Sequence, residues 1–397
     1  MRNTVLACVA ALSVHASAQF EWEQLPDFPG TARDDAAAFT IGSRIYVGTG
    51  MEVGWGLTND WHLYDADENW WLSMSTLPAA PRQYCTAFTL GDKGYLFGGI
   101  TASGAVNELW MYDPAIDAWQ ARAPLPGPGR YASVSYTRNG LAYVQGGVLA
   151  DGSITNELWY YAPGSDEWTL LDFVLNAELP ARHRSAVIKE AGFNIITCGI
   201  DALGATSAAT YMQLGLGHEY IGQIPLPSPR FGARGAANVL IGGASTFAQE
   251  HDEVWQFRWA EGWNQDLPAF AGGPRRGGIA AHVPTGDVNR IYFGLGLHGS
   301  NRFKDWWVLN LPVGIEEHAA SHVSVFPNPA SDALQVRAPN DWICATFTIN
   351  DMLGRVTASG QLSSAGTIDI ASFSPGRYSL RMDNPHSSAL TSFIKLP

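Results

Sequence analysis

Basic charge, cysteine and long apolar runs are all scarce in this chain, and each scarcity excludes a class of protein. Asp and Glu outnumber Lys and Arg by 37 to 24, for a net charge of −13, so the basic face that nucleic-acid binding requires is missing. After the amino-terminal segment, no apolar run approaches the roughly 20 residues that a membrane-spanning helix needs. We therefore expect neither a nucleic-acid partner nor a transmembrane segment.

The amino-terminal segment has the features of a secretory signal peptide. Residues 1–18 combine a basic second residue, an apolar run and a small-residue ending. We expect cleavage before Gln19 and exclude this segment from the fold. A lipoprotein cleavage box at residues 5–8 is the less favoured alternative, because Cys8 lies too close to the start to leave a full apolar core.

Three cysteines remain in the mature chain: Cys85, Cys198 and Cys344. An odd number rules out a complete disulfide framework in an exported protein. Cys85 and Cys198 fall in repeat units two apart, so a bridge between them is not expected. Both are predicted to be small buried core residues.

A pattern that recurs about every 49 residues decides the fold class. Each unit has an arginine, two short alternating runs ending in paired glycines, a polar loop, a strand resembling Asn-Glu-Leu-Trp, and a tryptophan strand. In the third unit the two alternating runs flank Asn139-Gly140, the strongest short hairpin signal. Four short antiparallel strands per unit are typical of a propeller blade. The unit arginines, which we call the blade arginines, are Arg33, Arg82, Arg130, Arg182, Arg230 and Arg275.

The two ends of the repeat array are complementary. The sixth unit stops after its third strand, around Trp307, and the mature chain begins with an unpartnered tryptophan strand around Trp22. A ring of blades leaves no open sheet edge. We therefore expect the Trp22 strand to complete the sixth blade of a closed, six-bladed ring.

The repeat resembles the kelch repeat, which has a glycine pair followed by a spaced Tyr and Trp, as in Gly98-Gly99, Tyr112 and Trp119. The resemblance covers residues 19–312 and implies an all-β, six-bladed kelch-like β-propeller. Two units depart from it. Cys198 replaces the first glycine of unit four, and unit five has twelve positions from Arg230 to Gly242 where units two and three have sixteen.

Beyond an expected linker at residues 313–322, the pattern changes. Residues 323–397 form short alternating strands separated by turn residues, enough for a small β-sandwich. This tail resembles the type A carboxy-terminal sorting domain of the type IX secretion system of Bacteroidetes. The resemblance implies Sec export, then the type IX machinery as a partner, removal of the tail, and release or attachment at the outer cell surface. The matching positions include Pro327, Asn328, Pro329, Gly354, Gly376, Tyr378 and Lys395.

Motifs for cofactors and metals are incomplete. Residues 294–299 fit a dinucleotide fingerprint, but a polar loop and a strand follow where the fingerprint needs a helix. Residues 65–69 open like a calcium loop, yet Trp70 replaces the required glycine. Galactose oxidase also has kelch repeats, but Tyr84 and Cys85 are neighbours whose side chains would face opposite sides of a strand. We expect no cofactor and no metal.

The blade arginines are the first candidate site. Each precedes a first strand, which in propellers lies nearest the axis, so six would converge at one channel mouth and attract anionic ligands. Alternatively each arginine ties its own blade together. We favour the structural interpretation because all six units carry the arginine, including the degenerate ones. The loops after the glycine pairs are less symmetric, and there Trp55, His298 and Arg302 are the candidate ligand contacts.

These features favour a secreted or cell-surface module that binds a glycan or a protein without catalysis. The alternative is an enzyme acting on acidic sugars, because sialic acid epimerases are kelch-like propellers and an arginine mouth would suit a carboxylate. Such an enzyme needs a general base, for which Glu250 and His251 are the first candidates. A structural surface-layer component, which would need self-association, is the third hypothesis.

Overall fold

The structure is a computed structural model with two compact parts, Met1–Pro312 and Val313–Pro397. The expected signal peptide and linker lie outside the described residues. Within the described residues the regular structure is entirely β-strand, and no helix is long and apolar enough to cross a membrane. The described residues are 20–171, 179–190, 192–214, 217–220, 224–259, 261–286, 288–312, 324–328, 330–337, 345–351, 355–363, 366–383 and 388–396.

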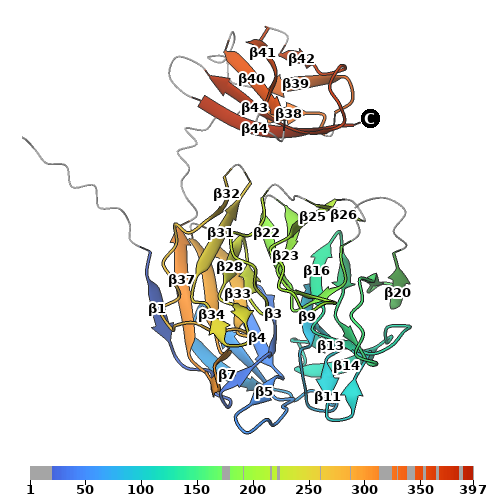
Figure 1. The fold of residues 1–397 in the computed structure, drawn as a ribbon, viewed down its shortest axis with the longest axis vertical. Helices are drawn as coiled ribbons and strands as arrows, with labels where there is room; N and C mark the ends of the chain where they lie inside the picture. The colour runs from blue at the N-terminus through green and yellow to red at the C-terminus, as the bar shows by residue number, and fades with distance from the viewer. Residues whose placement is uncertain are drawn as a thin grey trace, which may run out of the picture. The chain divides into compact units, whose positions relative to one another are not determined.

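The first part is built from six four-stranded antiparallel sheets, which are the blades (Figure 1). Blades one and two comprise β3 (Ala37–Ile41), β4 (Arg44–Gly48), β6 (Trp61–Asp65) and β7 (Trp70–Met74), then β9 (Thr86–Leu90), β10 (Lys93–Phe97), β13 (Leu109–Asp113) and β14 (Ala118–Arg122). Blades three and four comprise β16 (Val134–Arg138), β17 (Leu141–Gln145), β19 (Leu158–Ala162) and β20 (Glu167–Leu170), then β22 (Ala186–Glu190), β23 (Phe193–Thr197), β25 (Thr210–Leu214) and β26 (Gly217–Tyr220). Blades five and six comprise β27 (Arg234–Ala236), β28 (Val239–Ile241), β31 (Val254–Arg258) and β32 (Gly262–Asn264), then β33 (Ile279–Thr285), β34 (Val288–Gly294), β37 (Trp306–Pro312) and β1 (Trp22–Leu25).

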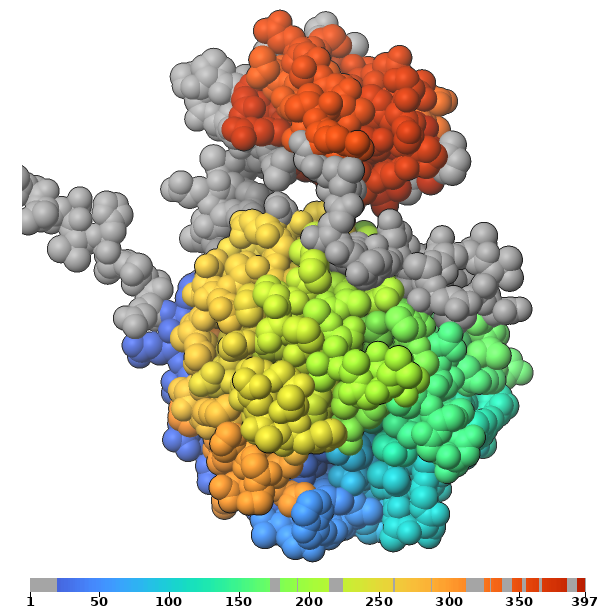
Figure 2. All heavy atoms as spheres, viewed as in Figure 1, coloured from blue at the N-terminus to red at the C-terminus, as the bar shows by residue number. Residues whose placement is uncertain are grey.

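The amino-terminal strand completes the sixth blade. Strand β1 pairs antiparallel with β37, with Gln24 opposite Trp307. The Trp22 indole also donates a hydrogen bond to the Pro268 carbonyl of the preceding blade, at 3.3 Å. Trp71, Trp119 and Trp168 make the equivalent bond to the loop that precedes their own blade. The predicted role of the Trp22 strand is confirmed, and Figure 2 shows the first (blue) and sixth (orange) units side by side.

Short ribbons extend beyond the inner strands and carry the loops after the glycine pairs. They form six small sheets, one for each unit. These ribbons are β2 (Arg33–Asp34) with β5 (Met51–Glu52), β8 (Arg82–Gln83) with β11 (Ile100–Thr101) and β12 (Gly104–Ala105), β15 (Arg130–Tyr131) with β18 (Val148–Leu149), β21 (Arg182–His183) with β24 (Ile200–Asp201), β29 (Ala244–Thr246) with β30 (Gln249–Glu250), and β35 (Leu297–His298) with β36 (Asn301–Arg302).

The glycine pairs allow the chain to pass from blade to ribbon. The second glycine has a φ that side-chain residues rarely adopt, 100° at Gly99, and a Cβ there would lie 2.9 Å from the Gln83 carbonyl oxygen. The first glycine of each pair also has a left-handed backbone, but with a smaller φ, 64° at Gly98. Cys198 occupies this position in blade four with a φ of 65°, which explains why that blade tolerates the loss of its first glycine.

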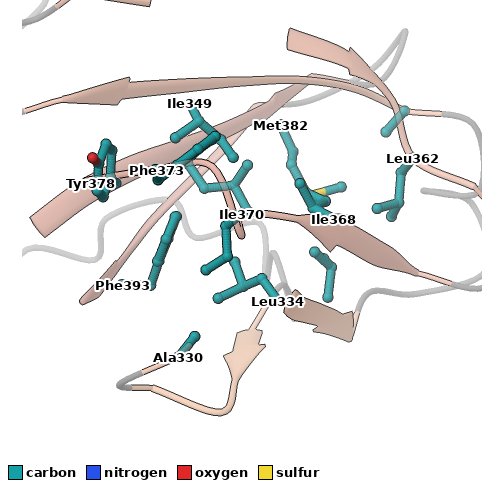
Figure 3. Close-up of a cluster of buried hydrophobic side chains, with 13 residues drawn as sticks. Ala330, Leu334, Ile349, Leu362, Ile368, Ile370, Phe373, Tyr378, Met382 and Phe393 are labelled. Carbon is teal, nitrogen blue, oxygen red and sulfur yellow. The ribbon is translucent and has the colours of Figure 1, made fainter. Parts of the chain in front are cut away.

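The second part is a small sandwich of two antiparallel sheets. Its core is a single apolar cluster that includes Leu334, Ile349, Ile368, Leu380 and Phe393 (Figure 3). The three-stranded sheet contains β38 (Ser324–Phe326), β39 (Ala333–Arg337) and β42 (Thr367–Asp369). The four-stranded sheet contains β41 (Val356–Gln361), β40 (Thr346–Asp351), β43 (Gly376–Asp383) and β44 (Ser388–Lys395), in that order.

Several of the tail positions singled out in the sequence hold this sandwich together. Asn328 donates to the Ser392 carbonyl at 3.1 Å and accepts the Ile394 amide at 3.0 Å, so its side chain attaches the first turn to β44. The Tyr378 hydroxyl donates to the Ser374 carbonyl at 2.8 Å. The side chain of Lys395 is buried, whereas Pro327 is exposed and Gly376 begins β43. Pro329 and Gly354 lie outside the described residues.

The two described cysteines are free thiols. Burial raises the pKa of Cys85 to about 12 and that of Cys198 to about 11. Thiols with raised pKa values carry little of the reactive thiolate at neutral pH. Cys198 is buried, as predicted, whereas Cys85 is only half-buried. Cys8 and Cys344 lie outside the described residues.

Candidate functional site

The blade arginines are buried inside their own blades. Their exposed fractions lie between 0% and 5%, and five of the six contact a carboxylate that immediately precedes the third strand of the same blade. These pairs are Arg33 with Asp60, Arg82 with Glu108, Arg130 with Glu157, Arg230 with Glu253, and Arg275 with Asp305.

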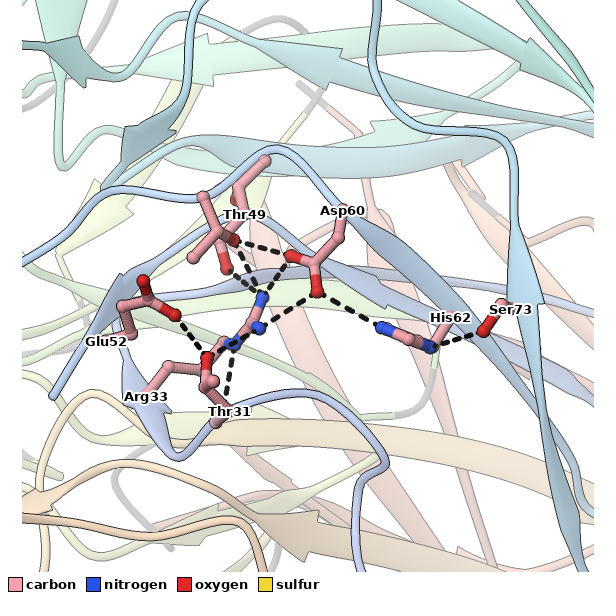
Figure 4. A network of polar contacts seen from close by, with 8 residues as sticks. Thr31, Arg33, Thr49, Glu52, Asp60, His62 and Ser73 are labelled. Atoms are coloured by element: carbon pink, nitrogen blue, oxygen red, sulfur yellow. Dashed lines mark hydrogen bonds and ion pairs between the residues drawn. The ribbon is translucent and has the colours of Figure 1, made fainter.

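The first blade shows how each pair is built (Figure 4). Arg33 donates through its two Nη atoms to the two carboxylate oxygens of Asp60, at 2.5 and 3.0 Å, and also to the Thr49 carbonyl. His62 lies 3.1 Å from the same carboxylate. Burial alone raises the pKa of Asp60, but the hydrogen bonds of His62 and Arg33 outweigh it, and the pKa lies well below its usual range. The guanidinium thus ties the ribbon to the glycine position and to the third strand.

The alternative in which these arginines converge at the channel mouth to contact a ligand does not fit their burial. Their side chains point into the blades and are already engaged by protein groups, as the structural interpretation requires. Blade four departs from the pattern because Ala209 occupies the position of the acid. There Arg182 donates to the Cys198 carbonyl at 3.1 Å, and its guanidinium lies 4.9 Å from the centre of the Tyr211 ring.

A second set of six residues, two positions after the blade arginines, surrounds the propeller axis. All six have a left-handed backbone, with φ between 51° and 64°. Each donates its amide N–H to the carbonyl of the preceding member at 2.8 to 3.1 Å, and the sixth bond leads back to the first residue. We call this set the axial ring: Asp35, Tyr84, Ala132, Arg184, Gly232 and Gly277.

The axial ring forms the floor of a cavity on the side of the ribbons, which we call the loop-face cavity. Its volume is about 250 Å³. The floor contributes Asp35, Tyr84 and Arg184, and the wall includes Trp55, Phe247, Arg276 and Arg302. All three charged or aromatic floor residues also line the narrower channel below, which has a volume of about 180 Å³.

The sequence located this cavity only in part. Trp55 and Arg302, two of the predicted loop contacts, lie on its wall. His298 lies beside it, with its Nδ1 atom 3.5 Å from Glu250. Glu250, a candidate base, is buried and paired with Arg276. His251, the other candidate base, is half-buried, and burial lowers its pKa; neither candidate lines the cavity.

Sequence reasoning missed the axial-ring members together with Phe247 and Arg276. One signal could have found the ring: the position two residues after each blade arginine carries a different kind of side chain in most units. Within the described residues, no group of three or more His, Cys, Asp or Glu side chains could hold a metal ion.

Comparison with known proteins assigns both parts of the chain. The family model of the KLHDC2/KLHL20/DRC7 Kelch-repeats domain matches residues 7–199, and that of the secretion system C-terminal sorting domain matches residues 324–395. The chain therefore contains a Kelch-repeat domain, within an all-β propeller, and a type IX secretion sorting domain. The sorting domain indicates secretion or export to the cell surface.

The Kelch domain also resembles a solved structure, "Structure of YjhT", with a TM-score of 0.61 and 17% identity. That match covers 74% of this chain and 98% of the other, and at this identity it shows the fold alone. No curated protein sequence matches the chain.

The charged groups around the loop-face cavity of the Kelch domain are arranged in pairs. Arg302 contacts Asp34 at 2.5 Å, and Arg276 is paired with Glu250. Arg184 differs, because it donates to a neutral acceptor, the Tyr84 hydroxyl, at 2.9 Å. The cavity therefore combines two neutralised arginines with one that faces no carboxylate at ion-pair distance among the described residues.

Asp35 is the one carboxyl on the floor of the cavity. It is buried, with Arg234 at 3.5 Å on the channel side. Burial, followed by the neighbouring charge of Asp34, raises the pKa of Asp35 to about 7, although Arg234, Arg184 and Tyr84 act in the opposite direction. Its carboxyl group can thus change its charge near neutral pH.

Two large aromatic side chains on the wall are exposed. Trp55 is 75% exposed, and the Arg302 guanidinium lies 4.9 Å from the centre of its ring. Phe247 is 63% exposed and packs against Phe231, with ring centres 4.9 Å apart. Both rings are therefore supported by protein neighbours while most of their surface remains exposed.

Below the axial ring, the channel of the Kelch domain is lined mainly by small residues such as Ala36, Ala87 and Ser135. It leads to a wider space of about 630 Å³, whose lining includes Lys189 and His282. The opposite end also carries aromatic side chains, Phe39, Phe88 and Tyr136, whereas the carboxyl Asp35 lies at the axial ring.

Proposed function

We propose that the protein is a non-enzymatic binding module whose Kelch domain holds a glycan in the loop-face cavity. The observation that carries this proposal is the pair of exposed, well-supported rings, Trp55 and Phe247, on the wall of a cavity whose floor carries polar groups. Aromatic faces pack against the apolar faces of sugar rings, while fixed polar groups set the orientation of a ligand. Arg184, Tyr84 and Asp35 supply such groups on the floor.

The proposed site of action is at or beyond the outer cell surface. The sorting domain supports export by the type IX machinery, and the residues before Gln19 support an earlier Sec-dependent step. A secreted propeller with a rigid scaffold and asymmetric loops suits adhesion or capture of an external ligand. A protein ligand on the same face is the second possibility that the experiment must separate.

An enzyme acting on sugars is the second candidate function, favoured by one observation. Asp35 has a pKa near 7 and lies on the floor of the cavity, and a group with such a pKa is suited to proton transfer. The arginine mouth that first suggested this alternative is absent. Turnover of a bound glycan, lost in the Asp35→Asn variant, would favour the enzyme over the binding module.

The binding proposal is tested with a glycan array probed by the full secreted chain. A Trp55→Ala variant should lose most binding, because the exposed ring is removed without disturbing a blade. Trp70→Ala is the matched control: this tryptophan is also exposed, at 47%, but lies in β7, the outer strand of blade one. If the folded protein binds no glycan, or if both variants bind like the parent, the proposal fails and a protein ligand becomes the leading hypothesis.

A further inference from the structure

The loop-face cavity has one cationic group, Arg184, with no carboxylate at ion-pair distance among the described residues, although, against the effect of burial, Tyr84 and Asp35 raise its pKa. Arg302 and Arg276 are each paired with a carboxylate, Asp34 and Glu250. Arg184 faces the same cavity but, within the part of the chain that the structure describes, its side chain donates only to the Tyr84 hydroxyl. Burial keeps the pKa of Tyr84 above its usual value, so this partner stays neutral.

Aromatic rings hold the Arg184 guanidinium in place. It lies 4.7 Å from the ring centre of Tyr84, 5.8 Å from that of Phe247 and 6.0 Å from that of Phe231. Its backbone is left-handed, with a φ of 54°, a conformation that is costly for a long side chain and is typical of functional positions. A fixed guanidinium facing a cavity is suited to bind an anionic group through paired hydrogen bonds.

Asp35 is the natural competitor for this guanidinium. It lies on the same floor, and the charged or titratable groups that act on it are Asp34, Arg184, Arg234, Tyr84 and Arg276. When Asp35 is protonated, the arginines around it and the cavity, Arg184, Arg234, Arg276 and Arg302, outnumber Asp34 and Glu250 by two positive charges. When Asp35 ionises, that excess falls to one, and a second negative charge joins that of Asp34 at the cavity.

We infer that Arg184 binds an anionic group of the glycan, a carboxylate or a sulfate, and that protonation of Asp35 admits this group to the cavity. This inference rests on the proposed glycan site and adds the charge of the ligand and the control of its binding. Binding of the anion and of the proton are linked, so the affinity for acidic ligands falls as pH rises through the pKa of Asp35.

The experiment measures affinities of the full chain for two acidic probes and two neutral ones at about pH 5.5, 7 and 8.5. The acidic probes are a galacturonic acid trisaccharide and a galactose 6-sulfate disaccharide, and the neutral probes are the galactose counterparts of each. Both anionic groups remain ionised over this range, so a pH effect belongs to the protein. We expect the acidic probes to lose about tenfold or more in affinity between the extremes, and the neutral probes to be unaffected.

Two variants separate the roles of the charged groups. Asp35→Asn keeps the shape, suits a left-handed backbone, and should bind acidic probes tightly at every pH. Arg184→Gln should lose the preference for acidic over neutral probes while still binding neutral ones, which also proves that it folds. His298→Gln is the control, because this exposed side chain lies beside the cavity without lining it and should leave the pH dependence intact.

The outcomes distinguish the inference from the function on which it rests. Neutral probes that bind as well as acidic ones overturn the inference and leave the glycan site standing. A pH dependence that persists in Asp35→Asn also overturns it. If no probe binds to the folded chain, the proposed function and the inference fail together. Preference for only one of the two acidic probes identifies the anionic group.

Discussion

Two positions that are only two residues apart in every Kelch unit behave in opposite ways. The blade arginine is the same residue in all six units, buried and engaged within its blade. The axial-ring position shares one backbone conformation and one hydrogen-bond pattern, yet carries Asp35, Tyr84, Ala132, Arg184 or glycine. Within this repeat, uniform side chains maintain the scaffold, whereas varied side chains on a uniform backbone create an asymmetric site.

The largest change in stability is expected when a blade arginine, which is the same residue in all six units, is replaced. In an Arg82→Met variant, Glu108 loses its ion pair at 2.7 Å and the Gly98 carbonyl loses a donor. Removing one partner of a buried pair costs about 3 to 5 kcal/mol, and the partial exposure of Glu108 reduces this to about 2 to 4 kcal/mol. Chemical denaturation should show this loss in the free energy of unfolding.

The control for that change is Arg44→Ala. Arg44 is 57% exposed and lies 3.5 Å from Asp65, so its loss should change the free energy of unfolding by less than about 1 kcal/mol. If the Arg82→Met variant is as stable as this control but fails to bind ligand, the blade arginines contact the ligand and do not serve mainly to stabilise the scaffold.

The sequence predicted the scaffold better than the site, for a physical reason. The blades could be predicted because local sequence patterns, such as the glycine pair or the Trp22 strand, reflect backbone conformation and burial directly. The site depends on the direction in which a side chain points. The left-handed residue two positions after each arginine turns the chain, so Arg33 points into its blade while Asp35 faces the axis. Spacing alone could not separate these two directions, so the sequence left both the channel mouth and the structural role open for the arginines and did not single out Asp35.

A smaller change in stability is expected at Asp35, an axial-ring residue, and this change should depend on pH. The raised pKa of Asp35 means that the folded state binds a proton more tightly than the unfolded chain. Stability should therefore fall as pH rises from the unfolded pKa near 4 to about 7, and then level off. Each unit of difference in pKa corresponds to about 1.4 kcal/mol.

An Asp35→Asn variant removes this proton linkage. We expect it to exceed the parent chain in stability by about 1 to 3 kcal/mol at pH 8, and to match it more closely at pH 5. Asp34→Asn provides the contrast: it breaks the pair with Arg302 and should destabilise the fold at both pH values. Parallel pH profiles for the Asp35→Asn variant and the parent would contradict the assignment of a neutral carboxyl to the axial ring.

The smallest change in stability is expected in blade four, where the blade arginine Arg182 has no acidic partner before the third strand. Blade four has Ala209 where the other blades carry an acid, and burial lowers the pKa of Arg182 there. Ala209→Glu would give Arg182 the partner that Arg130 has in Glu157, because both positions immediately precede the third strand. We expect a gain of about 0.5 to 1 kcal/mol in the free energy of unfolding. Ala209→Gln, which has the same size without the charge, should give less than half of this gain. If the two variants are equal, the acid contributes only a hydrogen bond, and the Tyr211 ring already compensates the charge of Arg182 in this blade.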